Sequence, residues 1–196
     1  MVTKKKNETR TVILEAALKV LKENPGKLNI SRVAHLAKCS RQAIYLHFSD
    51  STELQVATAR YIDEKFELDI LVTEVLTAQT PEQLLKNYVD LCAMHNPELY
   101  AVIRAADSVR RTDKAVEAAW KDRLAWRRRI GYQIAERLKS WNALAPHWTT
   151  RSAGDWLTVQ GSIQVWEEIV LDLKYSTSRF TNVMYSALSH ALLIRK

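Results

Sequence analysis

Apolar residues recur along this chain at steps of three and four, the spacing of one face of an α-helix. No sustained alternation of apolar and polar positions predicts a strand, and only four Gly and four Pro interrupt the 196 residues. The pattern therefore predicts an all-α fold of about nine helices. They are expected at about residues 8–23, 30–37, 41–48, 50–75, 80–95, 97–106, 112–140, 150–173 and 178–193.

Two short helices joined by a tight turn are predicted between residues 29 and 48. Their apolar faces are formed by Ile30, Val33, Ala34 and Ala37 in the first helix and by Ala43, Ile44, Tyr45 and Phe48 in the second. Ser40 precedes the second helix, where its hydroxyl can accept a free backbone N–H and cap the helix. Seven or eight helical residues form a rod roughly 12 Å long, which fits the major groove of DNA, about 12 Å wide. We expect a helix-turn-helix with Arg41 and Gln42 in the first turn of its second helix.

Positive charge is concentrated in the same part of the chain. Residues 1–60 contain 11 Lys or Arg and 5 Asp or Glu, a net charge of +6 out of the total of +7. A basic segment attached to a nearly neutral body is typical of a DNA-binding module. Residues 1–9 carry Lys4, Lys5 and Lys6 without an apolar face, and we expect a mobile arm that either lies along DNA or is only solvated.

This segment resembles the DNA-binding domain of the TetR family of bacterial transcriptional regulators. The resemblance covers about residues 8–60 and departs from the family at Lys38, usually Gly, and at Ser51, often Lys. If Lys38 takes a left-handed backbone, the cost is roughly 1 kcal/mol. The matching residues are Val33, Ala34, Ala37, Cys39, Ser40, Ile44, Tyr45, His47 and Phe48, followed by Asp50, Glu53 and Leu54.

The resemblance implies a DNA-binding domain at residues 1–53 and a helical ligand-binding and dimerisation domain at residues 54–196. In the reading helix, Gln42 is suited to pair with adenine and Ala43 to touch a thymine methyl group. For Tyr45, a core position with the hydroxyl at the rim is compatible with a phosphate contact. The residues expected to contact DNA are Arg32, Lys38, Ser40, Arg41, Gln42, Ala43, Tyr45, His47, Ser51 and Thr52.

The resemblance also implies a pocket for a small hydrophobic or aromatic effector among the helices of the C-terminal domain. For each lining candidate, ordinary core packing is the alternative. Three consecutive arginines, 127–129, are interpreted as a solvated face or an acidic-partner contact rather than a second nucleic-acid patch. The lining candidates are Tyr88, Cys92, His95, Tyr100, Trp120, Trp126, Trp156, Gln160 and Trp166.

The last two predicted helices, at 150–173 and 178–193, have wide apolar faces. A two-fold dimer would bury these faces as a four-helix bundle, whereas packing within one chain is the alternative. Dimerisation would also set two reading helices about 34 Å apart, one turn of a palindromic DNA site. The predicted function is a homodimeric repressor that a small-molecule effector releases from its operator.

Two other classes of function remain as alternatives. Cys92 and His95 share a helix face and would serve a helical enzyme or a metal sensor, although a metal site needs three or four ligands. The third possibility is a helical interaction module that does not bind DNA. Two cysteines, no leader and no long apolar run predict a cytoplasmic protein without a membrane segment, and no motif calls for a cofactor.

Overall fold

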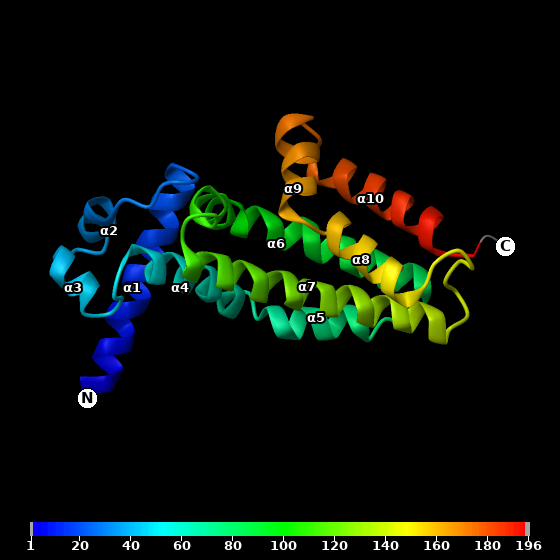
Figure 1. The fold of residues 1–196 in the computed structure, drawn as a ribbon, viewed down its shortest axis with the longest axis horizontal. Coiled ribbons are helices and arrows are strands. Elements are labelled where there is room, and N and C mark those ends of the chain that lie inside the picture. The colour runs from blue at the N-terminus through cyan, green and yellow to red at the C-terminus, as the bar shows by residue number, and fades with distance from the viewer. Residues whose placement is uncertain (1, 195–196) are drawn as a thin grey trace. The chain divides into compact units, whose positions relative to one another are not determined.

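The computed structural model describes residues 2–194, with side chains from residue 7 onward. Over this range the protein is all-α and the only strand-like feature is a bridge between Leu144 and Leu193, so the predicted fold class is confirmed. Figure 1 shows the helices in chain order. They are α1 (Val2–Glu23), α2 (Ile30–Leu36), α3 (Arg41–Tyr45), α4 (Ser51–Lys65), α5 (Leu68–Leu76), α6 (Pro81–Val109), α7 (Lys114–Ser140), α8 (Thr150–Gln160), α9 (Ile163–Trp166), the π-helix η1 (Glu167–Asp172) and α10 (Thr177–Leu192).

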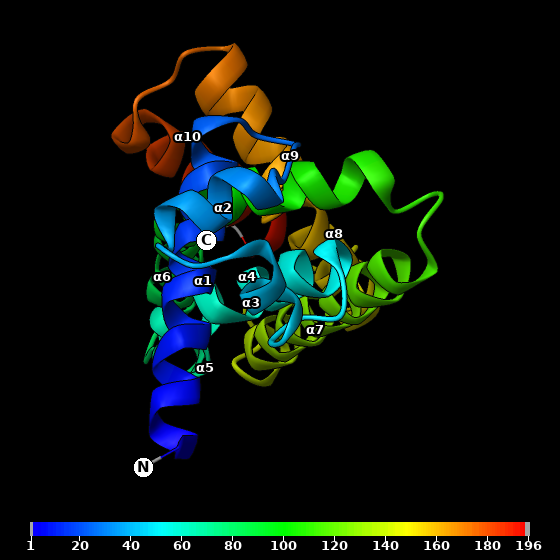
Figure 2. The same ribbon diagram turned by 90° about the vertical axis from the view of Figure 1, so that its left-hand side faces the viewer.

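The chain forms two compact units. Unit 1 combines Met1–Lys65 with Leu99–Lys121, and unit 2 combines Phe66–Glu98 with Asp122–Lys196. Unit 1 therefore contains α1 to α4 together with the end of α6 and the beginning of α7. Figure 2 presents α1 to α4 toward the viewer. These units are defined by compactness and not by function, so the predicted boundary between a DNA-binding and an effector-binding domain after residue 53 stays a prediction.

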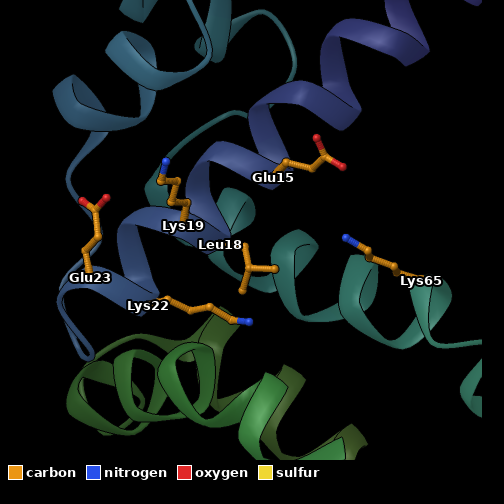
Figure 3. Close-up of a pocket in the computed structure, with 6 residues that line it drawn as sticks. All are labelled: Glu15, Leu18, Lys19, Lys22, Glu23 and Lys65. Atoms are coloured by element: carbon orange, nitrogen blue, oxygen red, sulfur yellow. The ribbon is translucent and has the colours of Figure 1, made fainter.

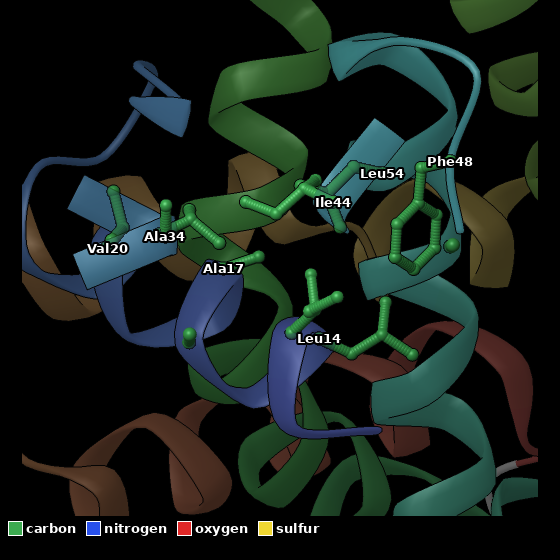
Figure 4. Close-up of a cluster of buried hydrophobic side chains, with 11 residues drawn as sticks. Leu14, Ala17, Val20, Ala34, Ile44, Phe48 and Leu54 are labelled. Atoms are coloured by element: carbon green, nitrogen blue, oxygen red, sulfur yellow. The ribbon is translucent and has the colours of Figure 1, made fainter. Parts of the chain in front are cut away.

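In unit 1, α1 packs against both α2 and α4, and α2 packs against α3. The apolar faces of these helices meet in the cluster shown in Figure 4, which we call the N-terminal core. The short helices α2 and α3 are held mainly by this burial, because helices of five to seven residues are not stable alone. The core consists of Ile13, Leu14, Ala16, Ala17, Val20, Val33, Ala34, Ile44, Phe48, Leu54 and Ala57.

The expected start of the first helix is wrong. Instead of following a mobile arm at residues 1–9, α1 already begins at Val2. The segment contains no Pro or Gly and therefore does not oppose a helix, even though it has no apolar face to bury. The side chains of Lys4, Lys5 and Lys6 lie outside the described residues, so their proposed DNA contact stays a prediction.

The helix predicted at residues 50–75 is two helices. α4 ends at Lys65, and Glu67 adopts a left-handed backbone with φ 48° before α5 begins at Leu68. The apolar spacing continues across the break, because Leu68, Val72 and Val75 are buried on α5. Periodicity alone therefore concealed the interruption.

The opposite error concerns Pro97, which was expected to separate two helices. Instead, α6 runs without a break through Pro97. A proline inside a helix costs about 3 kcal/mol through a lost hydrogen bond and a clash. Here Pro97 is exposed, whereas Val89 before it and Leu99 and Val102 after it are buried on the same helix. The burial of these side chains offsets the cost of the proline.

The helix predicted at residues 150–173 is also interrupted. α8 ends at Gln160 with Gly161 as its C-cap, and Ser162 caps the short helix α9 by accepting a hydrogen bond from the N–H of Val165 at 3.3 Å. The wider π-helix η1 follows directly, and α10 packs against both α8 and η1. α7 and α8 approach closely where Gly131 meets Gly154.

Candidate nucleic-acid interface and effector site

The turn before α3 has the geometry that the sequence predicts. The hydroxyl of Ser40 accepts a hydrogen bond from the backbone N–H of Ala43 at 3.0 Å, which caps the helix. Lys38 adopts a left-handed backbone with φ 51°, so the cost of roughly 1 kcal/mol for a side chain in this conformation applies. The N–H of Cys39 then bonds the carbonyl of Ala34 at 3.0 Å and closes the turn. These contacts fix the direction in which α3 starts.

α3 is anchored by Ile44 and presents its first turn to solvent. Ile44 is 1% exposed within the N-terminal core, whereas Arg41 and Gln42 are exposed and Ala43 is half-buried. Neither the side chain of Arg41 nor that of Gln42 has a hydrogen-bond or ion-pair partner among the described residues. A guanidinium and a side-chain amide are the groups that pair with guanine and adenine in the major groove. The side chains expected to read DNA are therefore accessible.

The end of α3 adds an exposed rim. Tyr45 is 44% exposed, which fits a phosphate contact better than a core position, and Phe48 is buried. His47 is partly buried, with its ring 6.4 Å from that of Phe48. Leu46, which the sequence analysis missed, is 79% exposed beside these residues. Its position outside the apolar face of the helix is the signal that would have identified it as available for contact.

The start of α4 carries a hydrogen bond that the sequence did not predict. The hydroxyl of Thr52 donates to Oδ2 of Asp113 at 2.7 Å, within unit 1. This bond lowers the pKa of Asp113 below its usual value, with the backbone N–H of Val116 adding to the effect. Ser51 is exposed. Of the two predicted phosphate contacts on α4, Thr52 thus already has an acidic partner.

A modified capping box also fixes the start of α4. Asp50 accepts a hydrogen bond from the N–H of Glu53 at 2.8 Å, as expected, but the Glu53 carboxylate accepts from the N–H of Ser49 at 2.6 Å. This second bond lowers the pKa of Glu53. Both contacts stabilise the first turn of α4 next to the helix-turn-helix.

Arg32 and Lys38, the remaining predicted phosphate contacts, are exposed. Arg32 forms an ion pair with Glu23, with Nε 3.4 Å from Oε2, so it would share its charge between this carboxylate and a phosphate. Glu23 also lines a shallow depression of about 400 Å³ on α1 and α4, which Figure 3 shows. Because flexible lysine and glutamate side chains form most of its wall, nothing in the depression defines a specific ligand. It is lined by Glu15, Leu18, Lys19, Lys22, Glu23 and Lys65.

Unit 2 brings three of the nine predicted effector contacts together. Tyr88 and Cys92 on α6 and Gln160 at the end of α8 line a narrow cleft that has no room for a water molecule. Gly161 permits this close packing, because a side chain there would collide with the Tyr88 hydroxyl. The other lining residues are Val89, Gly161, Phe180, Met184 and Leu188, the last three from α10.

The polar groups of this cleft are neutral. The Tyr88 hydroxyl donates to the carbonyl of Leu157 at 2.7 Å, and burial raises its pKa well above the usual value. Burial also raises the pKa of the Cys92 thiol to about 12. A protonated thiol is a poor nucleophile and a poor metal ligand. Among the described residues, no group of three or more His, Cys, Asp or Glu side chains is placed to hold a metal ion.

Arg127 on α7 does not line the cleft but interacts electrostatically with Tyr88 and Cys92, a relation that the sequence did not indicate. It is partly buried, and its Nε is shielded from solvent without a hydrogen-bond partner. Burial lowers its pKa, and so does the neighbouring positive charge of Arg123, while Tyr88 and Cys92 raise it. No carboxylate of the described residues pairs with it. Its place within a run of three arginines concealed this difference.

The other two arginines of that run behave differently. Arg128 forms an ion pair with Asp155, at 2.9 Å between Nη2 and Oδ1, and also bonds the hydroxyl of Tyr132 at 2.6 Å. The Tyr132 hydroxyl donates to Oδ1 of Asp155 at 2.8 Å, and this bond together with the bond from Arg128 lowers the pKa of Asp155. Arg129 is exposed. The three side chains therefore do not form one basic patch.

The remaining predicted effector contacts are dispersed. His95 is buried, with its ring 6.0 Å from that of Phe66, and Trp166 is buried as well. Trp126 is partly buried, and Trp156 is 39% exposed, 6.2 Å from the ring of Trp148. Tyr100 and Trp120 belong to unit 1, where the guanidinium of Arg110 lies 4.4 Å from the Trp120 ring. Unit 2 therefore does not gather all nine residues around one cavity.

The structure thus defines an all-α protein with an N-terminal helix-turn-helix and a second helical unit. It has the fold of the TetR-family transcriptional regulators, which confirms the predicted resemblance at the level of the fold. No family model and no curated protein matches the sequence. In the described part of the chain, no helix has both the length and the apolar character to cross a bilayer.

Solved structures supply the comparison. A transcriptional regulator from Saccharomonospora viridis in complex with choline superposes with a TM-score of 0.82 at 14% identity, over 96% of this chain and 100% of the other. A TetR transcription regulator from Haloarcula marismortui gives 0.76 at 17% identity, over 96% and 100%. FadR from Bacillus subtilis in complex with stearoyl-CoA gives 0.71 at 16% identity, over 92% and 98%. All three are transcriptional regulators, and two hold small molecules.

Proposed function

We propose that this protein is a TetR-like transcriptional regulator that binds a palindromic DNA operator as a homodimer in the cytoplasm. The observation that carries the proposal is the first turn of α3, where Arg41 and Gln42 are exposed and unpartnered above a helix anchored by Ile44. Residues 1–53 form the DNA-binding domain, and residues 54–196 form the effector-binding and dimerisation domain. Arg32, Lys38, Ser40, Tyr45, His47, Ser51 and Thr52 support the reading helix through the DNA backbone.

The dimer would form through α8, η1 and α10. Val159, Leu173 and Val183 are 55%, 63% and 43% exposed on these elements, and Trp156 is partly accessible too. Apolar side chains of this size gain free energy when a second copy covers them. Analytical ultracentrifugation tests this surface, since Val159→Glu with Val183→Glu would give a monomer.

The effector would bind in unit 2, next to Tyr88, Cys92 and Gln160, and would release the repressor from DNA. Among the matched regulators, one is bound to choline and another to stearoyl-CoA, so the fold accommodates small molecules. Release requires that the effector and the operator weaken each other reciprocally, by a coupling of typically 1–3 kcal/mol.

DNA binding is tested by selecting fragments from a random duplex library and measuring mobility shifts on the selected sequence. Arg41→Ala and Gln42→Ala should each weaken this complex by roughly 1–3 kcal/mol, the value of one bidentate base contact. Arg60→Ala is the matched control, because Arg60 is an exposed cation on α4 of the same unit. If both variants bind the selected DNA as tightly as the wild type, α3 is not the helix that reads DNA. If the wild type binds no duplex at low salt, the protein is better described as an interaction module.

A further inference from the structure

The cleft in unit 2 has an apolar wall, and one positive charge without an acidic partner interacts with its polar residues from outside the lining. The wall is formed by Val89 from α6 and by Phe180, Met184 and Leu188 from α10. The positive charge is Arg127 on α7, which interacts electrostatically with the two polar lining residues, Tyr88 and Cys92. Both neighbours are uncharged at neutral pH, so they do not neutralise the guanidinium.

A desolvated arginine without an anionic partner is unfavourable for the free protein, because the ion loses hydration without gaining an ion pair. Arg128, the next residue on the same helix, has a carboxylate partner, because it forms an ion pair with Asp155. Arg127 has instead a cationic neighbour, Arg123, which adds repulsion. A ligand that brings a negative charge would remove both costs at once.

We propose that the effector of this protein is an organic anion, a carboxylate with an apolar aliphatic or aromatic body, whose acid group pairs with Arg127. This inference rests on the proposed effector function of unit 2 and names the chemical class of the ligand. The apolar body lies against Phe180, Met184 and Leu188, which must move to admit it, because the cleft has no room even for a water molecule. Met184 is suited to this movement because an unbranched thioether side chain repacks easily.

The same argument separates this protein from its structural relative. Choline, the ligand of the regulator from Saccharomonospora viridis, is a quaternary ammonium cation. A cation next to Arg127 would meet two like charges, that of Arg127 itself and that of Arg123. Under this proposal, this protein and the regulator from Saccharomonospora viridis share a fold at 14% identity but bind ligands of opposite charge.

The test compares matched pairs of an acid and its amide on the full-length protein: octanoate with octanamide, and cinnamate with cinnamamide. Thermal unfolding and calorimetric titration measure binding to the wild type, Arg127→Met, Arg127→Lys and Arg129→Met. At least one acid should bind the wild type roughly tenfold or more tightly than its amide, the value of a hydrogen-bonded charged group. Arg127→Met should abolish this preference, and Arg127→Lys should retain part of it.

Arg129→Met is the control, because Arg129 is exposed on the same helix and should leave the preference for the acid unchanged. The free Arg127→Met protein should also melt at a higher temperature than the wild type, since the substitution removes a buried charge and keeps an apolar stem. An arginine that only supports the fold would give the opposite result. Unfolding temperature therefore distinguishes a ligand-binding arginine from a structural one.

The proposal is overturned if no acid of the panel binds, if amides bind as tightly as acids, or if Arg127→Met keeps the preference for acids. Operator binding without ligand is measured separately by mobility shift. Loss of acid binding with intact DNA binding would refute only this inference. Absence of DNA binding would refute the proposed regulator, whatever the acids do.

Discussion

The N-terminal core and the cleft of unit 2 bury side chains in opposite ways. The N-terminal core is wholly apolar, and Arg41, the one charged residue of α3, lies outside it. In unit 2, the cleft brings a tyrosine hydroxyl and a thiol together with leucine and phenylalanine, and the Nε of Arg127 is shielded from solvent as well. Under the proposed function, the comparison means that one unit keeps its polar groups on the surface for DNA, whereas the other holds them inside for a small molecule.

The largest expected effect concerns packing of the N-terminal core. Phe48→Ala should lower the free energy of unfolding by ~3–5 kcal/mol, because Phe48 is 1% exposed and its removal leaves a cavity. Urea denaturation measures the change. Leu46→Ala, two residues away and almost fully exposed, should change stability by no more than about 0.5 kcal/mol. Similar losses for the two variants would contradict the separation of core and surface at the end of α3.

A second effect tests packing in unit 2, where backbones rather than large side chains come together. A Cβ at Gly131 would lie 2.5 Å from the carbonyl oxygen of Gly154 and 3.0 Å from Oγ1 of Thr158. Gly131→Ala should therefore destabilise the protein by ~1–3 kcal/mol through overpacking of α7 on α8. The control is Gln133→Ala, exposed on the same helix, which should not lower the urea midpoint.

A smaller effect concerns charge on the surface of unit 1. Asp113→Asn removes a negative charge beside Thr52 and the start of α4, where DNA phosphates are expected, so operator affinity should rise a few-fold, on the order of 2- to 5-fold. Asparagine also caps helices, so the start of α7 should be retained. Mobility shifts at constant salt measure the change, with Asp122→Asn on the same helix as the control. Unchanged or weaker binding would show that Asp113 does not oppose the DNA.

The smallest effect is the contribution of Glu53 to the pH dependence of stability. In the folded protein, the hydrogen bond from the N–H of Ser49 lowers the pKa of Glu53 below its usual value of 4.5. The stabilising contribution of Glu53 is therefore complete above the usual pKa and disappears as the pH falls through the lower pKa of the folded protein. Wild type should lose slightly more stability than Glu53→Gln on acidification below about pH 4.5. Urea midpoints across this range provide the measurement, and parallel curves would contradict it.

Local features of the helix-turn-helix were predictable because neighbouring residues determine them. Ser40 caps α3 and Phe48 is buried, both as the short-range pattern indicates. The partner of Thr52 was not predictable, because Asp113 lies 61 residues further along the chain. The DNA and effector contacts themselves stay predictions until they are measured.

The less predictable features depend on how far tertiary burial outweighs local preference. Pro97 carries the usual signal of a helix end, yet the buried residues on both sides keep α6 continuous. Conversely, the apolar spacing near Glu67 indicates a continuous helix that the structure divides. The same holds for the candidate site. Residues 127–129 are all arginines, and only the structure shows that Arg127 is partly buried, that Arg128 forms an ion pair and that Arg129 is exposed.

The continuity of α6 through Pro97 has a mechanical consequence. Because proline has no backbone N–H, the carbonyl of Ala93 loses its usual partner in the helix, and the rod is least stiff at this rung. The boundary between unit 2 and unit 1 follows at once, between Glu98 and Leu99. A force that bends α6 would therefore bend it most near Pro97, where the chain passes from unit 2 to unit 1.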